Sequence, residues 1–188
     1  MAYFPAFIEM KNVRALLIGG GTIAQEKLEK LLNFTQDISI ITLEVNEDVR
    51  RLSKTHNLTL EKRAYERGDI DGFDMVVVAT NTVALHQEIY EETRGTRTLV
   101  NSVDNTEYCD FIFPSYVQKG DLTVAFSTGG ASPAFTKKMR QYFEKNIPDS
   151  VENFLVQMKK LRKTMPKGKS RMHHFEALVE SYFSKYFK

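Results

Sequence analysis

The sequence predicts an α/β fold, because short apolar runs alternate along the chain with segments that have helical spacing. The runs Ala15–Ile18 and Val76–Ala79 are continuous and rich in β-branched or aliphatic residues. Such runs are typical of strands that are buried on both faces of a parallel sheet. The first run is closed by three glycines, which indicates a tight turn from a strand into a helix.

Each element is predicted from its own pattern. The first strand is Val13–Ile18, and the segment Thr22–Asn33 carries leucines at intervals that give one apolar helical face. Further strands are predicted at 38–43, 58–60, 75–79, 98–103, 111–113 and 122–126, and further helices at 85–93, 134–146, 151–161 and 175–187. This alternation places the first part of the chain in a Rossmann-like, doubly wound sheet.

The pattern changes in the second half of the chain. Between Asn101 and Gly130, strand-like pieces are separated by turn residues without a long helix, which predicts a β-rich connector or an oligomerisation element. From Pro133 onward the spacing is helical, with Ser132 as the predicted N-cap and Pro133 as the first helical residue. Pro148 interrupts this spacing, so a small helical domain is predicted after it.

The chain of 188 residues has a formal charge of only +2, but this charge is unevenly distributed. Nine basic and three acidic residues give residues 151–188 a net charge of +6, which leaves −4 for the first 150 residues. A basic tail on an acidic body indicates an anionic partner: nucleic acid, a membrane surface, or a polycarboxylate or phosphate ligand. A solvated helical face explains the same charges equally well.

The composition is that of a globular protein. Hydrophobic residues make up 42% of the chain, which excludes a disordered or fibrous protein. The apolar runs are far shorter than the about 20 residues that cross a bilayer, so no membrane span is expected. The start of the chain lacks the pattern of a secretory signal peptide, and the single Cys109 forms no internal disulfide. A cytoplasmic location is therefore expected.

The turn after the first strand has the spacing of a dinucleotide-binding fingerprint, Gly19-x-Gly21-x-x-Ala24. Gly19 allows the tight turn, Gly21 lets the backbone approach a pyrophosphate, and Ala24 allows close packing of the helix on the sheet. The amides of Thr22 and Ile23 then lie at the helix N-terminus, where unpaired donors and the helix dipole favour an anion. The turn lies between a buried strand and an amphipathic helix, which is the context that the motif requires.

Two other strand ends are predicted to complete the cofactor site. The second strand leads into Leu43 and Glu44, and an acidic residue about 20 positions after the fingerprint typically binds the ribose hydroxyls of NAD. NAD is favoured over NADP because residues 42–46 include no arginine to hold a 2′-phosphate. The alternative for Glu44 is a loop carboxylate that points into solvent. Thr80, at the end of a later strand, either lines the cofactor cleft or caps the next helix.

Other residues that often carry chemistry are interpreted as structural. His173 and His174 lack the i, i+4 spacing that places two ligands together, so no metal ligands are predicted. Cys109 has no flanking cation and no second cysteine, so it is interpreted as a buried structural thiol. His86 is interpreted as a surface or packing residue.

Several segments together resemble the precorrin-2 dehydrogenase family, which includes bifunctional dehydrogenase/ferrochelatases and the N-terminal part of siroheme synthases. The resemblance covers residues 3–150 strongly and the helical tail by position only. The segments that carry it are, in chain order, Tyr3-Phe4-Pro5-Ala6-Phe7, Gly19-Gly20-Gly21-x-x-Ala24, Ala79-Thr80-Asn81, Asn101-Ser102-Val103-Asp104, Cys109-Asp110-Phe111-Ile112-Phe113-Pro114 and Ser127-Thr128-Gly129-Gly130-Ala131-Ser132-Pro133.

The resemblance implies a domain organisation and an activity. It implies a Rossmann-like NAD-binding domain at residues 1–112, a β-rich dimerisation region at 113–147 and a small C-terminal helical domain at 148–188, within a homodimer. The implied activity is the NAD-dependent oxidation of precorrin-2, a tetrapyrrole, to sirohydrochlorin in siroheme biosynthesis. A bifunctional enzyme that also inserts ferrous iron is the first alternative. A non-enzymatic, NAD-sensing or nucleic-acid-binding regulator is the second.

The resemblance also implies roles for particular residues. The key acid of the family corresponds to Asp104, and its Ser/Thr-Gly-Gly turn corresponds to the substrate-binding residues Ser127, Thr128, Gly129 and Gly130. A carboxylate beside a nicotinamide is a suitable base, because oxidation of the reduced macrocycle requires a proton acceptor as well as a hydride acceptor. Capping of a turn is the alternative role for Asp104. A polycarboxylate substrate gives the basic tail an anionic partner, so nucleic acid is not the expected partner.

Overall fold

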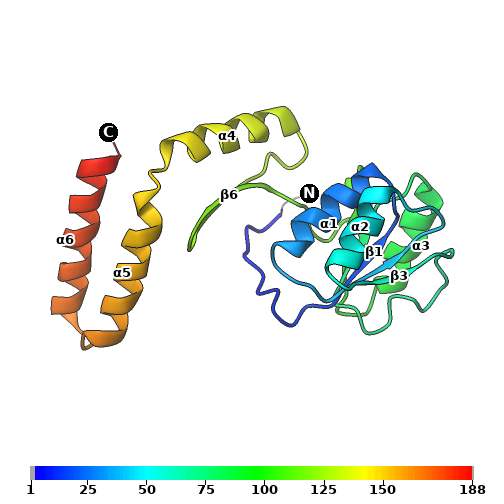
Figure 1. Cartoon of the computed structure of the whole chain (residues 1–188), viewed down its shortest axis with the longest axis horizontal. Coiled ribbons are helices and arrows are strands. Elements are labelled where there is room, and N and C mark those ends of the chain that lie inside the picture. The colour runs from blue at the N-terminus through cyan, green and yellow to red at the C-terminus, as the bar shows by residue number, and fades with distance from the viewer. Residues whose placement is uncertain (1–2, 188) are drawn as a thin grey trace. The chain divides into compact units, whose positions relative to one another are not determined.

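A computed structural model describes residues 3–187 of the chain, which form two compact units. The first unit ends at Ile112 and the second begins at Phe113. The first unit contains a five-stranded sheet and the second contains a two-stranded sheet. Figure 1 shows the elements of both units along the chain.

The five strands of the first unit are all parallel and lie in the order β3-β2-β1-β4-β5. The chain adds β2 and β3 on one side of β1, and then returns to add β4 and β5 on the other side. The order therefore reverses between β1 and β4, where ligands of open α/β sheets bind. The strands are β1 (Ala15–Ile18), β2 (Ile38–Ile41), β3 (Thr59–Glu61), β4 (Met75–Val78) and β5 (Leu99–Ser102).

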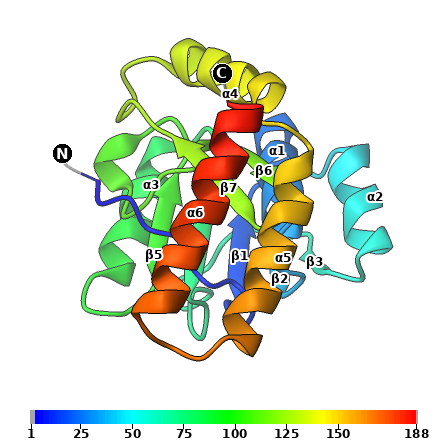
Figure 2. The same cartoon turned by 90° about the vertical axis from the view of Figure 1, so that its left-hand side faces the viewer.

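Helices cover both faces of this sheet. In Figures 1 and 2, α1 (Thr22–Leu32) and α2 (Glu47–Thr55) lie on one face and α3 (Val83–Thr93) lies on the other. All four residues of β1 and all four of β4 are buried. Burial on both faces explains why these strands are continuous apolar runs rather than alternating ones. The predicted α/β class and parallel sheet are confirmed.

Two elements of the first unit differ from the prediction. Helix α2 was missed because its sequence is mostly charged, and only Val49 and Ser53 of the helix are buried. Its start is fixed instead by the side chain of Asn46, which accepts a hydrogen bond from the Val49 N–H at 2.8 Å. The predicted strand at 111–113 is wrong. These residues are extended, but the carbonyl of Phe111 is bound by the Asn101 side chain at 2.9 Å rather than within a strand ladder.

The second unit combines a hairpin with three helices. The antiparallel strands β6 (Ser115–Lys119) and β7 (Leu122–Phe126) are followed by α4 (Pro133–Asn146), α5 (Ser150–Thr164) and α6 (Lys169–Tyr186). Helices α5 and α6 lie side by side in both views (Figures 1 and 2). The last helix begins at Lys169, earlier than the Phe175 start that was predicted.

A small core holds the second unit together. Val117 of β6, Ile147, Val151 of α5 and Tyr182 of α6 are buried against one another. The Tyr182 ring stacks on Phe154 with 4.2 Å between ring centroids, and its hydroxyl lies 2.8 Å from Ser150 Oγ. These contacts join both terminal helices to the hairpin. The observed β-rich segment and helical tail confirm this part of the predicted fold class.

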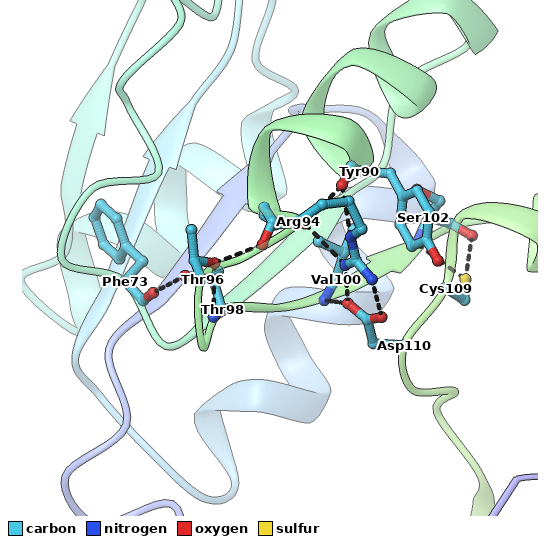
Figure 3. A network of polar contacts seen from close by, with 10 residues as sticks. Phe73, Tyr90, Arg94, Thr96, Thr98, Val100, Ser102, Cys109 and Asp110 are labelled. Atoms are coloured by element: carbon cyan, nitrogen blue, oxygen red, sulfur yellow. Dashed lines mark hydrogen bonds and ion pairs between the residues drawn. The ribbon is translucent and has the colours of Figure 1, made fainter.

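An ion pair secures the chain where it leaves the sheet (Figure 3). Both guanidinium nitrogens Nη1 and Nη2 of Arg94, just after α3, donate to Asp110 at 2.9 and 2.6 Å. The same carboxylate accepts the Val100 N–H at 3.0 Å, and Arg94 stacks over the Tyr90 ring at 3.9 Å. Burial alone would raise the pKa of Asp110, but these donors hold it below its ordinary value. Asp110 thus ties α3, β5 and the following segment together.

Replacement of Asp110 by asparagine should lower the free energy of unfolding at neutral pH by about 1–2 kcal/mol, because Arg94 loses its charged partner. A carboxyl group with a lowered folded-state pKa stabilises the fold above its ordinary pKa of 3.8, and this stabilisation is lost as the pH falls through the lowered value. The difference between wild type and Asp110→Asn, measured by urea unfolding, should therefore narrow between pH about 6 and about 2.5. Glu107→Gln, at an exposed carboxylate in the neighbouring turn, is the control. If the difference in the free energy of unfolding between wild type and Asp110→Asn is the same at both pH values, the Asp110 carboxylate does not stabilise the fold through its charge.

Candidate functional site

A cleft in the first unit lies at the carboxyl ends of its strands. It has a volume of about 1100 Å³ and is lined by the turn after β1, the residues after β2, β4 and β5, and the start of α3. This is the edge at which the strand order reverses. The cleft brings together Gly19, Gly21, Thr22, Ile23, Leu43, Glu44, Thr80 and Asp104, which were predicted as site residues.

The glycines after β1 are required by close backbone contacts. Gly19 has φ +125°, and a Cβ atom there would lie 2.2 Å from the Ala79 carbonyl oxygen after β4. At Gly20, a Cβ atom would lie 2.3 Å from the Glu44 carbonyl oxygen. Both positions exclude a side chain, so the ends of β1, β2 and β4 meet at this turn. The role of Gly20 was not predicted, since it is the variable position of the motif.

Gly21 has a different environment, which fits a dinucleotide. Its φ of −87° suits any residue, and an added Cβ would meet none of the described residues within 4 Å. Gly21 is the N-cap of α1, and no side chain from residues 3–187 caps that end. The first helical residues, Thr22 and Ile23, line the cleft. An open backbone surface at an uncapped helix N-terminus is suited to a pyrophosphate.

Ala24 does not line the cleft. It is a fully buried residue of α1, so it supports the site by allowing close contact between helix and sheet. This is the packing role that the motif predicts for the residue.

The loop after β2 is held against the glycine turn. Thr42 Oγ1 donates to the Glu44 carbonyl at 2.7 Å, and the Asn46 N–H donates to the Gly20 carbonyl at 2.8 Å. The exposed residues Leu43 and Glu44 project from this loop at the edge of the cleft. The loop geometry therefore brings a carboxylate to the wall where the motif places an acidic residue.

Arg63 also lines the cleft, and its guanidinium already binds two carboxylates. Its Nη1 and Nη2 donate to the Asp69 carboxylate at 2.6 and 2.8 Å, and its Nε donates to Glu61 at 2.7 Å. These hydrogen bonds raise the pKa of Arg63 and lower the pKa of Asp69. The guanidinium is thus committed to an intramolecular ion pair.

Asp104 lies in the turn after β5, with its backbone in a strained conformation. Its φ is +60°, which is uncommon for a residue other than glycine, although aspartate and asparagine tolerate it best. On one side the Val103 N–H donates to the Val78 carbonyl at 2.9 Å, and on the other the Asn105 N–H donates to the Ser102 carbonyl at 3.2 Å. The exposed Asp104 lines the cleft, which it reaches from β5. Strain of this kind occurs often at functional sites.

His86 was interpreted as a surface or packing residue, but it is buried at 3% exposure and lines the cleft. Its Nε2 lies 3.0 Å from the Thr80 carbonyl oxygen. Thr80 lines the cleft as well, whereas Thr82 is the N-cap residue of α3. Of the two roles considered for Thr80, the geometry therefore favours lining the cleft over capping α3. The position of His86 in the cleft could not be predicted from the sequence, because a single histidine outside any motif does not indicate which residues it contacts.

Cys109 is buried and bonded within the fold. Its Sγ accepts the Ser102 N–H at 3.2 Å and donates to the Ser102 carbonyl at 3.1 Å. Burial raises the pKa of the thiol, and the Ser102 N–H offsets this only partly. These contacts agree with a structural thiol.

The turn that was predicted to bind substrate lies in the second unit, between β7 and α4. Gly129 and Gly130 have φ values of +60° and +90°, which require glycine-like backbone freedom. Ser127 Oγ accepts the Gly129 N–H at 3.1 Å, and Thr128 Oγ1 accepts the Ser132 N–H at 2.9 Å. The hydroxyls therefore shape the loop that leads into α4. Their role in substrate binding stays a prediction.

Within residues 3–187, no helix is both long and apolar enough to span a membrane. The same residues contain no group of three or more His, Cys, Asp or Glu side chains placed to hold a metal ion.

The class of protein is defined by the parallel sheet with its glycine turn at the switch point: a dinucleotide-binding, Rossmann-like protein. A family model described as "Putative NAD(P)-binding" matches residues 6–115, and a second, "Sirohaem biosynthesis protein central", matches residues 119–146. The chain therefore belongs to the NAD(P)-binding family of the first model, and a nicotinamide dinucleotide is its cofactor.

Proteins of similar sequence include siroheme synthases. The siroheme synthase of Pseudoalteromonas atlantica is 34% identical over 165 residues, which are 88% of this chain and 36% of that protein. The siroheme synthase of Methylococcus capsulatus is 29% identical over 184 residues, or 96% of this chain and 39% of that protein. The chain thus spans well under half the length of these relatives.

A solved structure titled "SirC, precorrin-2 dehydrogenase" superposes with a TM-score of 0.78 at 25% identity, and the match covers 98% of this chain and 91% of that one. The predicted resemblance to the precorrin-2 dehydrogenase family is confirmed by these matches.

The two glycines of the fingerprint should respond differently to alanine. Gly19→Ala should lower the free energy of unfolding by at least about 2 kcal/mol, because the Cβ atom would overlap the Ala79 carbonyl and the positive φ is strained. Gly21→Ala should stay within about 1 kcal/mol of wild type, since its backbone is ordinary and its surroundings are open. Gly21→Ala should nevertheless bind the dinucleotide at least about tenfold more weakly, because the Cβ atom occupies the approach to the pyrophosphate.

Urea unfolding and equilibrium NAD+ binding, measured on both variants, check this contrast. Equal losses of stability in the two variants would mean that the close contact at Gly19 is not formed. Wild-type affinity in Gly21→Ala would mean that the pyrophosphate binds elsewhere.

Proposed function

We propose that the protein oxidises precorrin-2 to sirohydrochlorin with NAD as the hydride acceptor. The observation that carries this proposal is the position of Asp104, an exposed carboxylate held at φ +60° on the wall of the dinucleotide cleft. The solved relative titled "SirC, precorrin-2 dehydrogenase" and the curated siroheme synthases support the choice of substrate and pathway. The proposal assigns to Asp104 the role of general base.

In the proposed reaction, the bound dinucleotide supplies the electrophilic centre that accepts a hydride from the reduced macrocycle. The Asp104 carboxylate accepts the proton that the macrocycle releases. Its position in a turn that is bonded to β4 and β5 holds the base at a fixed place on the cleft wall. The amides at the start of α1 bind the pyrophosphate, so that the cofactor is oriented by backbone groups.

NAD is the proposed cofactor in preference to NADP. The Glu44 carboxylate at the edge of the cleft fits ribose hydroxyls, and it repels a 2′-phosphate. Arg63 is an arginine of the cleft lining. Its guanidinium is engaged in ion pairs with Asp69 and Glu61, which disfavours binding of a 2′-phosphate. Both features favour the unphosphorylated ribose.

The second unit is proposed to bind substrate and to form a homodimer. The loop Ser127–Gly130 offers backbone donors, and the basic residues of α5 and α6 offer charges for a polycarboxylate. The two-stranded hairpin is small, and Phe135 and Tyr142 of α4 are 58% and 61% exposed. A second copy of the chain could bury these exposed aromatic side chains and extend the short hairpin. Iron insertion, the other activity that the resemblance implies, stays a prediction.

Asp104→Asn tests the proposed base. Asparagine tolerates φ +60° as aspartate does, so the turn should be kept while the proton acceptor is lost. Turnover of precorrin-2 under anaerobic conditions, followed by sirohydrochlorin absorbance, should fall by about a hundredfold or more. NAD+ affinity should stay within about twofold of wild type, because Asp104 binds no part of the pyrophosphate. Near-normal turnover in this variant rules out Asp104 as the base.

Glu44→Gln tests the cofactor preference. Removal of the negative charge should strengthen NADP+ binding relative to NAD+ by about tenfold, since repulsion of a 2′-phosphate is relieved. Glu47→Gln, three residues further on in α2 and outside the cleft lining, is the matched control. If Glu44→Gln leaves the ratio of the dissociation constants for NAD+ and NADP+ unchanged, the Glu44 carboxylate does not contact the ribose.

A further inference from the structure

His86 occupies the first turn of α3, and its imidazole is buried against the end of β4. Its Nε2 lies 3.0 Å from the Thr80 carbonyl oxygen and 3.3 Å from Thr80 Oγ1. A carbonyl oxygen can only accept a hydrogen bond, so Nε2 is the donor in this contact. Within residues 3–187, Nδ1 is buried without a hydrogen-bond partner.

Packing alone does not explain a histidine at this position. A buried polar atom without a partner costs stability, and an aliphatic side chain of similar size would avoid that cost. The cap of α3 does not explain it either, because Thr82 is the N-cap residue and the imidazole reaches past it to Thr80. Among the described residues, the polar contacts of the ring are those of Nε2 with the Thr80 carbonyl and hydroxyl oxygens, so these contacts are what distinguishes histidine at this position.

Thr80 is placed where such a contact affects the cofactor. It follows Ala79, whose carbonyl oxygen lies against Gly19, and it lines the dinucleotide cleft. Thr80 Oγ1 faces the same Nε2–H, which it can share with the carbonyl in a bifurcated hydrogen bond, and its own hydrogen is then free for another acceptor. A dinucleotide is rich in such acceptors, on its ribose, carboxamide and phosphate groups.

We propose that His86 is a positioning residue for the cofactor: it donates from Nε2 to Thr80 and directs the Thr80 hydroxyl hydrogen toward an oxygen of the bound dinucleotide. The inference rests on the proposed function, because it takes NAD as the ligand of the cleft. The ring faces Thr80 through Nε2, and its other nitrogen, Nδ1, is buried. The effect of His86 on binding is transmitted through Thr80.

Equilibrium NAD+ binding to four variants tests this role. His86→Leu removes the donor, His86→Gln supplies an amide N–H in its place, Thr80→Val removes the hydroxyl, and the double variant combines His86→Leu with Thr80→Val. The two single removals should each weaken NAD+ binding about threefold to tenfold, the effect of one hydrogen bond. His86→Gln should recover most of the affinity, and the double variant should be no weaker than the weaker single variant.

Gln87→Leu is the matched control, because Gln87 is exposed on the same helix and is bonded to Glu91 at 2.7 Å. It should bind NAD+ as wild type does. In steady-state assays the His86→Leu change should raise KM for NAD+ and leave KM for precorrin-2 unchanged. If His86 had only a structural role, His86→Leu would raise KM for both NAD+ and precorrin-2, and His86→Gln would not restore NAD+ affinity.

Thermal unfolding identifies the variants that are folded. Wild-type affinity in folded His86→Leu overturns the inference, as does a folded His86→Gln that binds as weakly as His86→Leu. If the His86 variants do not fold, Thr80→Val decides the question, because wild-type affinity in that variant excludes the hydroxyl as a cofactor contact. Failure of the wild-type protein to bind NAD+ would contradict the proposed function itself, so the two failures are distinguishable.

Discussion

The structure of the site depends on the close approach of the backbone after β4 to the turn after β1. The Ala79 carbonyl lies where a Cβ atom of residue 19 would be, and the Glu44 carbonyl excludes a side chain at Gly20 in the same way. These contacts join the ends of the three strands that surround the switch point. A cleft forms there because the chain leaves β1 and β4 toward helices on opposite faces of the sheet (Figures 1 and 2), while Gly21 leaves the helix N-terminus open to a ligand.

The polar groups around this turn hold loops in place rather than filling the cleft. Thr42 and Asn46 bind the loop after β2, and Asp110 binds Arg94 and the Val100 N–H behind β5. The left-handed conformation of Asp104 persists between such bonded neighbours, which supply the stabilisation that a strained residue requires. Hydrogen bonds therefore hold the loops at the edge of the cleft, and the side chains of Glu44, Thr80 and Asp104 are left for its chemistry.

Much of this fold follows from the sequence, because buried parallel strands and a glycine turn have strong local patterns. The strands β1 and β4 and the helix α1 were predicted close to their observed bounds. Helix α2 was missed, since most of its residues are polar or charged and only Val49 and Ser53 are buried. The segment 111–113 was misassigned because a short apolar run does not reveal that the Phe111 carbonyl is bound by a side chain.

The site shows the same division. Gly19, Gly21, Glu44, Thr80 and Asp104 were predicted and lie together in one cleft, since strand ends in a parallel sheet meet at one edge. Gly20 and His86 were not predicted to belong to it. Their roles depend on contacts with residues outside any motif, namely the Glu44 carbonyl and the Thr80 carbonyl. Such contacts are visible only once the fold has brought the loops together.

The measurement that tests the proposed activity most directly is the stoichiometry of the wild-type reaction. Anaerobic incubation of the full chain with precorrin-2 and NAD+ should form NADH and sirohydrochlorin in equal amounts and at equal rates. An enzyme-free sample corrects for spontaneous oxidation of the macrocycle. Formation of sirohydrochlorin without NADH, or of neither product by folded protein, would contradict the proposed function.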